Sequence, residues 1–176
     1  MESISLNGCW KLYWRFPEHD ITSSLPDFTK LESVSAEVPG NVEIDLNRAG
    51  LLPDIFFGDN IWETKPWEPA EWFYCRSFEV SKELIENGAD LLFGGLDCFA
   101  DIWVNNTCIG SCDNMMIEHQ IDLKGVLRPG QNNLIVHIKS AAVQGRKHIH
   151  DAFETAMTVN WESLPVRKAS HMYGRS

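Results

Sequence analysis

Residues 51–70, LLPDIFFGDNIWETKPWEPA, combine aromatic, carboxyl and amide side chains in a proline-containing stretch without a strand pattern. An exposed indole such as that of Trp62 or Trp67 can stack on the apolar face of a pyranose ring. The carboxylate of Asp59 and the amide of Asn60 can bind the hydroxyl groups of the same sugar. The alternative is that the tryptophans close a core or pack against another domain. The stretch therefore predicts either a sugar-binding loop or a packing surface.

Two groups of potential metal ligands occur elsewhere in the chain. Cys108 and Cys112 are followed by His119, but a second pair of ligands at zinc-binding spacing is missing. His148 and His150 would project to the same side of an extended segment, although a solvated polar loop explains them more simply. We therefore predict neither a bound metal nor any other cofactor.

Carboxyl groups are the other candidates for chemistry, because hydrolysis of a glycosidic bond requires two of them about 5 to 9 Å apart. The chain has 25 Asp and Glu residues, so pairs abound and the sequence alone singles out none. The motifs G-x-S-x-G, G-x-G-x-x-G and H-E-x-x-H and the P-loop are absent. No residue of the chain is predicted to be catalytic.

The elements that would position these side chains are mostly strands. Apolar and polar residues alternate in short runs separated by Gly, Pro and Asn, at 9–16, 33–39, 71–80, 90–96, 98–104 and 132–140. Helical signals are few and lie at 41–50, 81–88 and 150–157. Period-two patterning with such punctuation is typical of an antiparallel sandwich or barrel. Because 176 residues suffice for one domain with a sizeable core, we predict a single all-β domain.

Asn105 and Asn106 separate two apolar runs, ADIWV and TCIG. Asparagine tolerates the positive φ angles that a two-residue hairpin loop requires. The same residues with Thr107 form the N-x-T pattern of a glycosylation site, which needs a secretory context. The odd number of cysteines lacks a paired framework, which weakens that context. We therefore favour the turn.

Composition limits the partners. The formal net charge of −10 and the isoelectric point near 5.0 argue against nucleic acid or an anionic membrane surface and suit a neutral ligand. No apolar run approaches the length of about 18 residues that a membrane-spanning helix needs. The first residues, MESISLNGCWKLYWRF, show no signal peptide. We interpret the cysteines as reduced core residues, namely Cys9, Cys75, Cys98, Cys108 and Cys112.

Three longer stretches of the chain together match the sequence pattern of a known domain family. They are VPGNVEIDLNRAGLLPDIFFGDN, WEPAEWFYCRSFEV and LLFGGLDCFADIWVNNTCIGSCDNMMIEHQIDLKGVLRPGQNNLIVHIKS. Together, from about Gly8 to Ser140, they resemble the N-terminal sugar-binding domain of glycoside hydrolase family 2, in its β-mannosidase branch. The pattern includes the Pro-Gly-x-Val entry and the pair Asp59 and Asn60. The resemblance implies a jelly-roll β-sandwich of the galactose-binding-like type, in agreement with the predicted strands.

The resemblance also implies a function. Enzymes of this family hydrolyse β-linked glycosides with retention, and their two catalytic glutamates lie in a (β/α)₈ barrel that follows one or more immunoglobulin-like domains. A barrel needs about 250 residues, so we expect this chain to be a non-catalytic domain that shapes or supports the parent enzyme's active site. The expected partners are those downstream domains and, through the parent, a β-linked carbohydrate. A free-standing carbohydrate-binding module and a structural docking domain are the alternatives.

The stretch VRKASHMYG, residues 166–174, resembles the segment in which β-mannosidases carry Arg-Lys-Ala before a Gly-Trp-Asp-Trp motif. Arg167 and Lys168 match this segment and join the expected substrate-binding residues in a supporting role. The glycine is followed here by Arg-Ser, whereas the family's Trp-Asp-Trp reaches the sugar. We expect 1–163 to form the sandwich and 164–176 to begin the terminal segment, with an open sheet edge that favours self-association.

Overall fold

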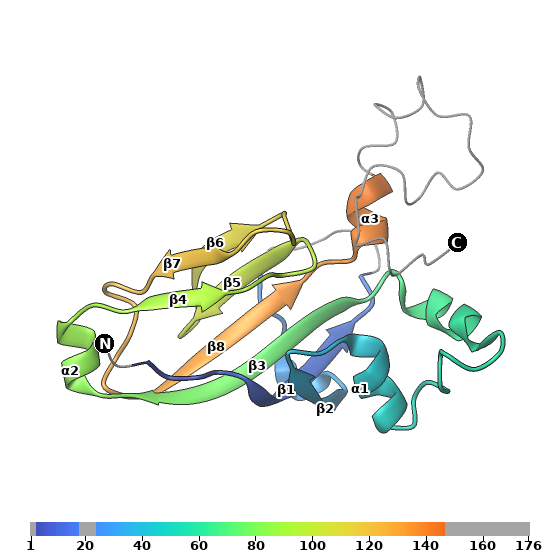
Figure 1. Ribbon diagram of the computed structural model, residues 1–176, viewed down its shortest axis with the longest axis horizontal. Coiled ribbons are helices and arrows are strands. Elements are labelled where there is room, and N and C mark those ends of the chain that lie inside the picture. Colours follow the sequence, from blue (N-terminus) through green and yellow to red (C-terminus); the bar gives the residue numbers. More distant parts are fainter. Residues whose placement is uncertain (1–2, 18–23, 147–176) are drawn as a thin grey trace, which may run out of the picture.

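The computed structural model describes residues 3–17 and 24–146, which contain eight antiparallel strands in two sheets (Figure 1). Six strands are ordered β2-β1-β3-β8-β5-β6, and β4 pairs with β7 in the second sheet. The larger sheet consists of β1 (Gly8–Arg15), β2 (Ser33–Val38), β3 (Glu71–Val80), β5 (Ala100–Val104), β6 (Thr107–Cys112) and β8 (Gly130–Ile138). The smaller sheet consists of β4 (Asp90–Phe93) and β7 (His119–Asp122). The predicted antiparallel β-sandwich is confirmed.

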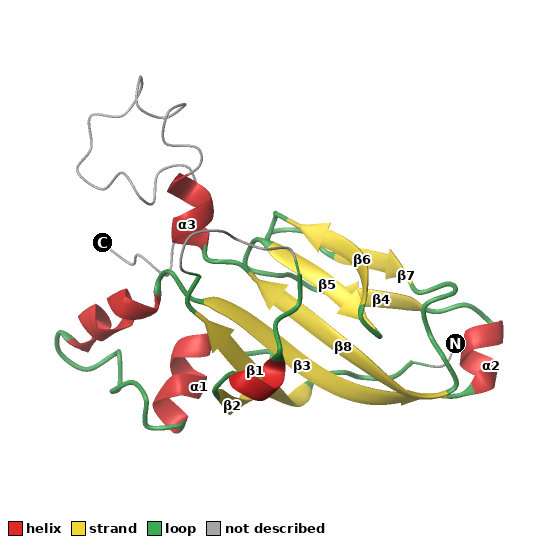
Figure 2. Cartoon of the chain, turned by 180° about the vertical axis from the view of Figure 1, so that it is seen from behind, coloured by secondary structure: helices red, strands yellow, loops and turns green. Residues whose placement is uncertain are grey.

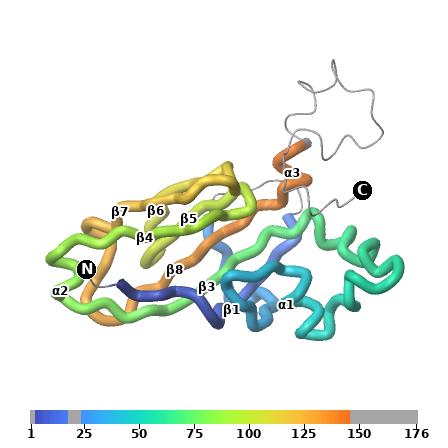
Figure 3. Tube along the Cα trace, viewed as in Figure 1, coloured from blue at the N-terminus to red at the C-terminus, as the bar shows by residue number. Residues whose placement is uncertain are grey.

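The core lies between the two sheets and follows from the alternation of apolar residues. On β1, Trp10, Leu12 and Trp14 point into one hydrophobic cluster and are at most 6% exposed. Leu91 of β4 joins the same cluster, as does Val136 of β8. In Figure 3 the green strand β3 runs between the blue β1 and the orange β8, so segments far apart in sequence form the centre of the large sheet. Burial of these side chains joins the sheets into one domain.

Short helices lie at the margins of the sheets (Figure 2). They are η1 (Phe28–Lys30), α1 (Val42–Arg48), η2 (Asn60–Trp67), α2 (Lys82–Glu86) and α3 (Ala141–Arg146). Side chains cap two of them: the oxygen of Asn41 accepts a hydrogen bond from the backbone N–H of Ile44, and Ser81 does the same for Leu84. These caps explain where α1 and α2 begin.

The helices predicted at 41–50 and 81–88 are confirmed, with shorter bounds. The helix predicted at 150–157 and the domain boundary at 163 lie outside the described residues. Every predicted strand run contains a strand, with bounds that differ by up to three residues. Strand β7 was not predicted, because three of its four residues are polar and it offers no alternating apolar face. Alternation thus predicts the buried strands and misses a strand at the margin.

The predicted Asn-Asn turn is confirmed. Asn105 and Asn106 have φ angles of 50° and 66° and connect β5 to β6. The amide nitrogen of Asn105 donates to the carbonyl oxygen of Val126 at 3.1 Å and to Oδ1 of Asn132 at 2.7 Å. Both amide hydrogens are therefore used in fixing the hairpin, whereas a glycan would replace one of them. The geometry favours the turn over the glycosylation site.

The interpretation of the cysteines as core residues is wrong for two of them. Cys98 and Cys112 are buried and Cys75 is partly buried, whereas Cys9 and Cys108 are exposed. Cys9 occupies a position of β1 that points away from the core, and Cys108 lies on the edge strand β6. Within the described residues, no helix is long and apolar enough to cross a membrane.

Candidate functional site

The predicted sugar-binding stretch leaves the sandwich between α1 and β3. We call residues 51–67 the aromatic segment, and the end of the molecule where it lies, together with α3, the open end (Figure 1). The second half of the segment is the 3₁₀ helix η2, in which no residue is fully buried. Pro66 fixes one φ angle of this helix and donates no backbone hydrogen bond, which suits a short 3₁₀ element better than a longer α-helix.

Trp67 packs on the core, so the alternative interpretation of the tryptophans holds for this residue. Its ring stacks on Trp72 at a centroid distance of 5.7 Å and an interplanar angle of 22°. It also meets Trp14 edge-on at 5.7 Å and Phe16 at 5.8 Å. Aromatic pairs at these distances add to the stabilisation from burial. Trp67 therefore anchors the end of the aromatic segment to the sheet.

Trp62, in contrast, is 58% exposed. The ammonium group of Lys65 lies 5.2 Å from the centre of its ring, a cation–π contact that orients the indole at the surface. Asp59 is exposed and precedes η2 without capping it through its side chain. The amide of Asn60 donates to the carbonyl oxygen of Asp54 at 2.8 Å, which fixes its orientation. The exposed Asp59 and Trp62 and the half-buried Asn60 thus lie together at the start of η2, apart from Trp67.

The surface of the aromatic segment is more apolar than its sequence predicted. Phe56 is 82% exposed, Phe57 is 76% exposed, and Leu51 and Ile61 are also exposed. Single exposed apolar residues are ordinary, but several in a short segment mark an interaction surface. The signal in the sequence was the adjacent Phe-Phe pair in a loop without strand alternation. Arg167 and Lys168, the other predicted binding residues, lie outside the described residues.

A row of charged side chains and one histidine crosses the large sheet beside this segment, on the face away from the core. We call Arg15, Glu71, His137, Asp101 and Lys139 the buried row. Glu71, His137 and Asp101 are 0%, 1% and 5% exposed. Asp101 and His137 interrupt otherwise apolar runs of β5 and β8, whereas the other three residues lie at or next to strand ends. This row was not predicted from the sequence.

Both carboxylates of the row stay ionised despite their burial. Burial raises the pKa of Glu71, but His137 at 3.3 Å and Arg15 at 2.7 Å favour the charged form and leave the pKa below its ordinary value. Burial likewise opposes the charge of Asp101, and Lys139 and Ser111, each at 2.7 Å, outweigh it, so that this pKa is also lowered. Arg15 pairs with Glu71 at one end of the row, and Lys139 pairs with Asp101 at the other.

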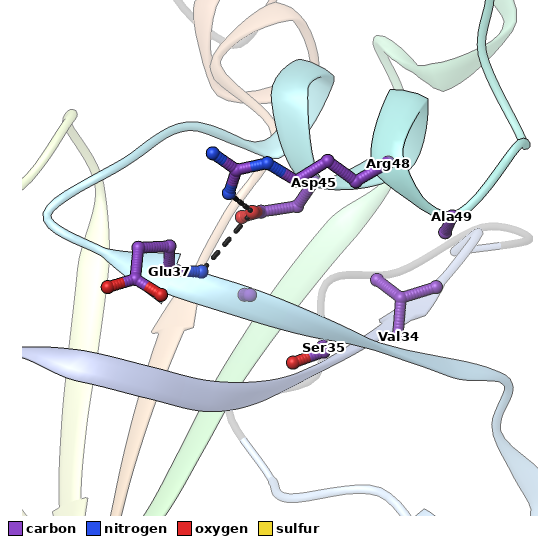
Figure 4. A pocket seen from close by; sticks show the side chains of 7 residues that line it. Val34, Ser35, Glu37, Asp45, Arg48 and Ala49 are labelled. Carbon is purple, nitrogen blue, oxygen red and sulfur yellow. Dashed lines mark hydrogen bonds and ion pairs between the residues drawn. The ribbon is translucent and has the colours of Figure 1, made fainter.

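Asp45 of α1 is a buried carboxyl whose pKa is shifted in the opposite direction to those of Glu71 and Asp101 (Figure 4). One oxygen accepts a hydrogen bond from the backbone N–H of Glu37 at 3.2 Å and lies 3.5 Å from the guanidinium of Arg48. The other oxygen, Oδ2, has no hydrogen-bond partner among the described residues. Burial raises the pKa of this carboxyl. The contact joins α1 to β2 across a recess of about 280 Å³, which Ser35 also lines.

Metal ligands do not converge in the described residues: no three His, Cys, Asp or Glu side chains form a group that could hold an ion. The site is therefore one of aromatic rings, amides and carboxylates on a β-sandwich. Such an arrangement can bind and orient a polar ring or another protein surface. The fold and this surface define a galactose-binding-like sandwich domain.

Residues 14–175 match the family model described as "Glycosyl hydrolase 2 galactose-binding domain-like". The chain belongs to this family, as its sequence pattern predicted. Over 168 residues it is 32% identical to β-mannosidase B of Thermothelomyces thermophilus, and over 140 residues it is 30% identical to the β-mannosidase of Mus musculus. The crystal structure of the β-D-mannosidase of Dictyoglomus thermophilum matches with a TM-score of 0.78 at 29% identity.

The coverage of these matches is unequal. They include 92%, 79% and 99% of this chain, respectively. The chain in turn spans 18%, 14% and 20% of the length of those three proteins. The similarity therefore concerns one domain of much longer glycoside hydrolases.

Proposed function

We propose that this chain is a non-catalytic N-terminal domain of a β-mannosidase-like family 2 glycoside hydrolase, in which it supports the active site. The observation that carries the proposal is the open end, where large apolar rings are exposed beside Asp59, Asn60 and Trp62. The similarity to two β-mannosidases at 32% and 30% identity supports the choice of parent enzyme. The parent protein acts on a β-linked glycoside with retention, and its catalytic carboxyls belong to another domain.

The aromatic segment has two tasks in this proposal. Phe56 and Phe57 dock on the downstream domains, because rings that are 82% and 76% exposed gain most from being covered. Asn60 and Trp62 face the sugar, with the amide binding hydroxyl groups and the indole stacking on the ring. Arg167 and Lys168 support the loop that follows.

The test uses the full polypeptide that carries this domain, assayed with 4-nitrophenyl β-D-mannoside, β-D-galactoside and β-D-glucuronide. We expect the mannoside to be the best substrate. Asn60→Ala should lower kcat/KM by about tenfold, which corresponds to the loss of one hydrogen bond to the sugar. Asn87→Ala, an exposed asparagine at the opposite end, serves as the control. Equal activity of the two variants would refute the role of Asn60.

A free-standing carbohydrate-binding module is the second candidate, favoured by the exposed Trp62 beside Asp59 and Asn60. Titration of the 176-residue chain with mannose, galactose and β-mannan oligosaccharides, followed by tryptophan fluorescence, separates the candidates. Millimolar or tighter binding that Trp62→Ala abolishes favours the module. A chain that does not respond favours the accessory domain, which meets its sugar only inside the parent enzyme.

A further inference from the structure

We propose that the buried row is a positioning device that holds the aromatic segment at a fixed angle to the large sheet. The use of that segment for sugar binding or docking rests on the proposed function, but the positioning itself does not.

The members of the row are neighbours across four adjacent strands. Arg15 of β1 is paired in register with Glu71 of β3, and Asp101 of β5 is paired with His137 of β8. His137 connects the two pairs: its Nε2 lies 3.3 Å from Glu71, and its Nδ1 lies 3.9 Å from Asp101. Lys139 closes the row at 2.7 Å from Asp101. These side chains therefore form one line across the end of the sheet where β3 begins.

The row lies in an apolar setting. The ring of Phe73 stacks on His137 at 4.3 Å with an interplanar angle of 12°, and Phe28 of η1 packs edge-on against Phe73. The guanidinium of Arg15 lies 5.3 Å from the centre of the same Phe73 ring. Electrostatic interactions in such surroundings are strong because little water screens them, and their energy depends on how the groups are oriented. Replacing a buried ion pair by apolar residues of similar size is often neutral or stabilising, so a directional role explains the charges better than a contribution to stability does.

Two connections lead from the row to the aromatic segment. Glu71 directly follows Ala70, whose N–H donates to the carbonyl oxygen of Trp67 at 2.9 Å. Ser140 directly follows Lys139, is 4% exposed, and donates its hydroxyl to the carbonyl oxygen of Glu68 at 2.5 Å. Both carboxylate–cation pairs thus lie one residue from a hydrogen bond that holds the end of the segment.

The same serine begins the next part of the chain. Its Oγ accepts a hydrogen bond from the N–H of Val143 in α3. The row therefore sets the exit direction of β8 together with the entry direction of β3. A shift of the end of β8 would move the segment through Ser140, and a shift of the start of β3 would move it through Glu71.

Hydrogen exchange of the 176-residue chain tests this proposal at the amides of Asn60, Trp62, Glu68 and Ala70, which all donate hydrogen bonds to carbonyl oxygens of the segment. Glu71→Gln keeps the shape of the side chain and removes its charge. We expect exchange at these amides to become about tenfold faster, an effect equivalent to about 1.4 kcal/mol of local opening free energy.

Val136→Ala is the matched control, since Val136 adjoins His137 on the same strand but faces the core. It should lower global stability and leave the segment within about twofold of the native exchange rate, after correction for global unfolding. Equal acceleration in the two variants would show that the row only stabilises the fold and would overturn the proposal.

A double replacement separates packing from positioning. Arg15→Met with Glu71→Leu replaces the first pair by apolar side chains, which should restore the thermal stability lost in Glu71→Gln. If the row positions the segment, exchange at Trp62 and Ala70 should stay fast in this variant. Recovery of native exchange would contradict the proposal. Because no sugar is involved, a failure here leaves the proposed function standing, and a failure of the Asn60→Ala assay leaves the row standing.

Discussion

The two ends of the large sheet differ in how far their side chains are paired and shielded from solvent. At the hairpin end, Asn132 is 0% exposed and its amide group is fully engaged, with Arg128, Gly130 and Asn105 as partners. At the open end, Phe56 is 82% exposed among other apolar side chains. At the hairpin end the buried polar groups form hydrogen bonds with one another. At the open end the exposed apolar side chains would be stabilised only if another surface covered them. The difference supports the proposal that the open end is the functional surface and that the hairpin end is structural.

The largest effect is expected at the hairpin end. Asn132→Ala should lower the free energy of unfolding by about 3 kcal/mol, because it removes the four hydrogen bonds that this buried side chain makes with the amide of Asn105 and with the backbone of Arg128 and Gly130. Urea denaturation measures this change. Asn133→Ala, at an exposed neighbouring position, should cost less than about 1 kcal/mol. Similar losses in both variants would remove the contrast between the ends.

The next comparison lies within the aromatic segment. Trp67→Ala should cost about 2 kcal/mol, since it removes the contacts with Trp14 and Trp72. Trp62→Ala should change stability by less than about 0.5 kcal/mol, because its ring is exposed. Thermal unfolding of the two variants separates the anchor from the presented ring, and equal costs would show that both belong to the core.

The smallest effect on stability concerns Asp45, which borders the open end through α1. Its pKa in the folded chain is raised above the ordinary value of about 3.9. A raised carboxyl pKa means that the folded state binds the proton more tightly, so stability falls as pH rises through the folded pKa. Asp45→Asn should therefore stabilise the chain by about 1 kcal/mol at pH 7 and have little effect at pH 3.

Unfolding curves of native chain and Asp45→Asn at the two pH values measure this difference. Glu71 and Asp101 provide the contrast, because their pKa values are lowered. Their stabilisation is present above the unfolded pKa values of about 4 and is lost as pH falls below them. A destabilised Asp45→Asn at pH 7 would mean that the attraction to Arg48 exceeds the cost of burial.

Strand alternation and turn chemistry predicted most of the sandwich. The run NNLIVHIKS places Leu134, Val136 and Ile138 on one face, which packs on the core, and Asn105-Asn106 shows where a hairpin turns. The different roles of Trp62 and Trp67 could not be predicted, since the segment that contains them has no apolar periodicity to assign a buried side. Their contacts depend on Trp14 and Trp72, which belong to other elements.

The buried row escaped prediction for a related reason. Its members come from four strands, and only the register of the folded sheet makes them neighbours. The sequence does contain a hint, because His137 interrupts the apolar run LIVHI of β8. A buried charge requires a partner, but a single sequence does not show which of the many charged residues is that partner.

The most direct test of the central claim, that the open end is the functional surface, is one comparison of kcat/KM in the full polypeptide that carries this domain. Phe56→Ser with Phe57→Ser changes the aromatic segment, and Leu92→Ser with Met116→Ser changes exposed apolar residues away from it. We predict a loss of about tenfold or more in the first variant only, with the thermal stability of the isolated chain unchanged in both. Native activity in the first variant, or an equal loss in both, would contradict the claim.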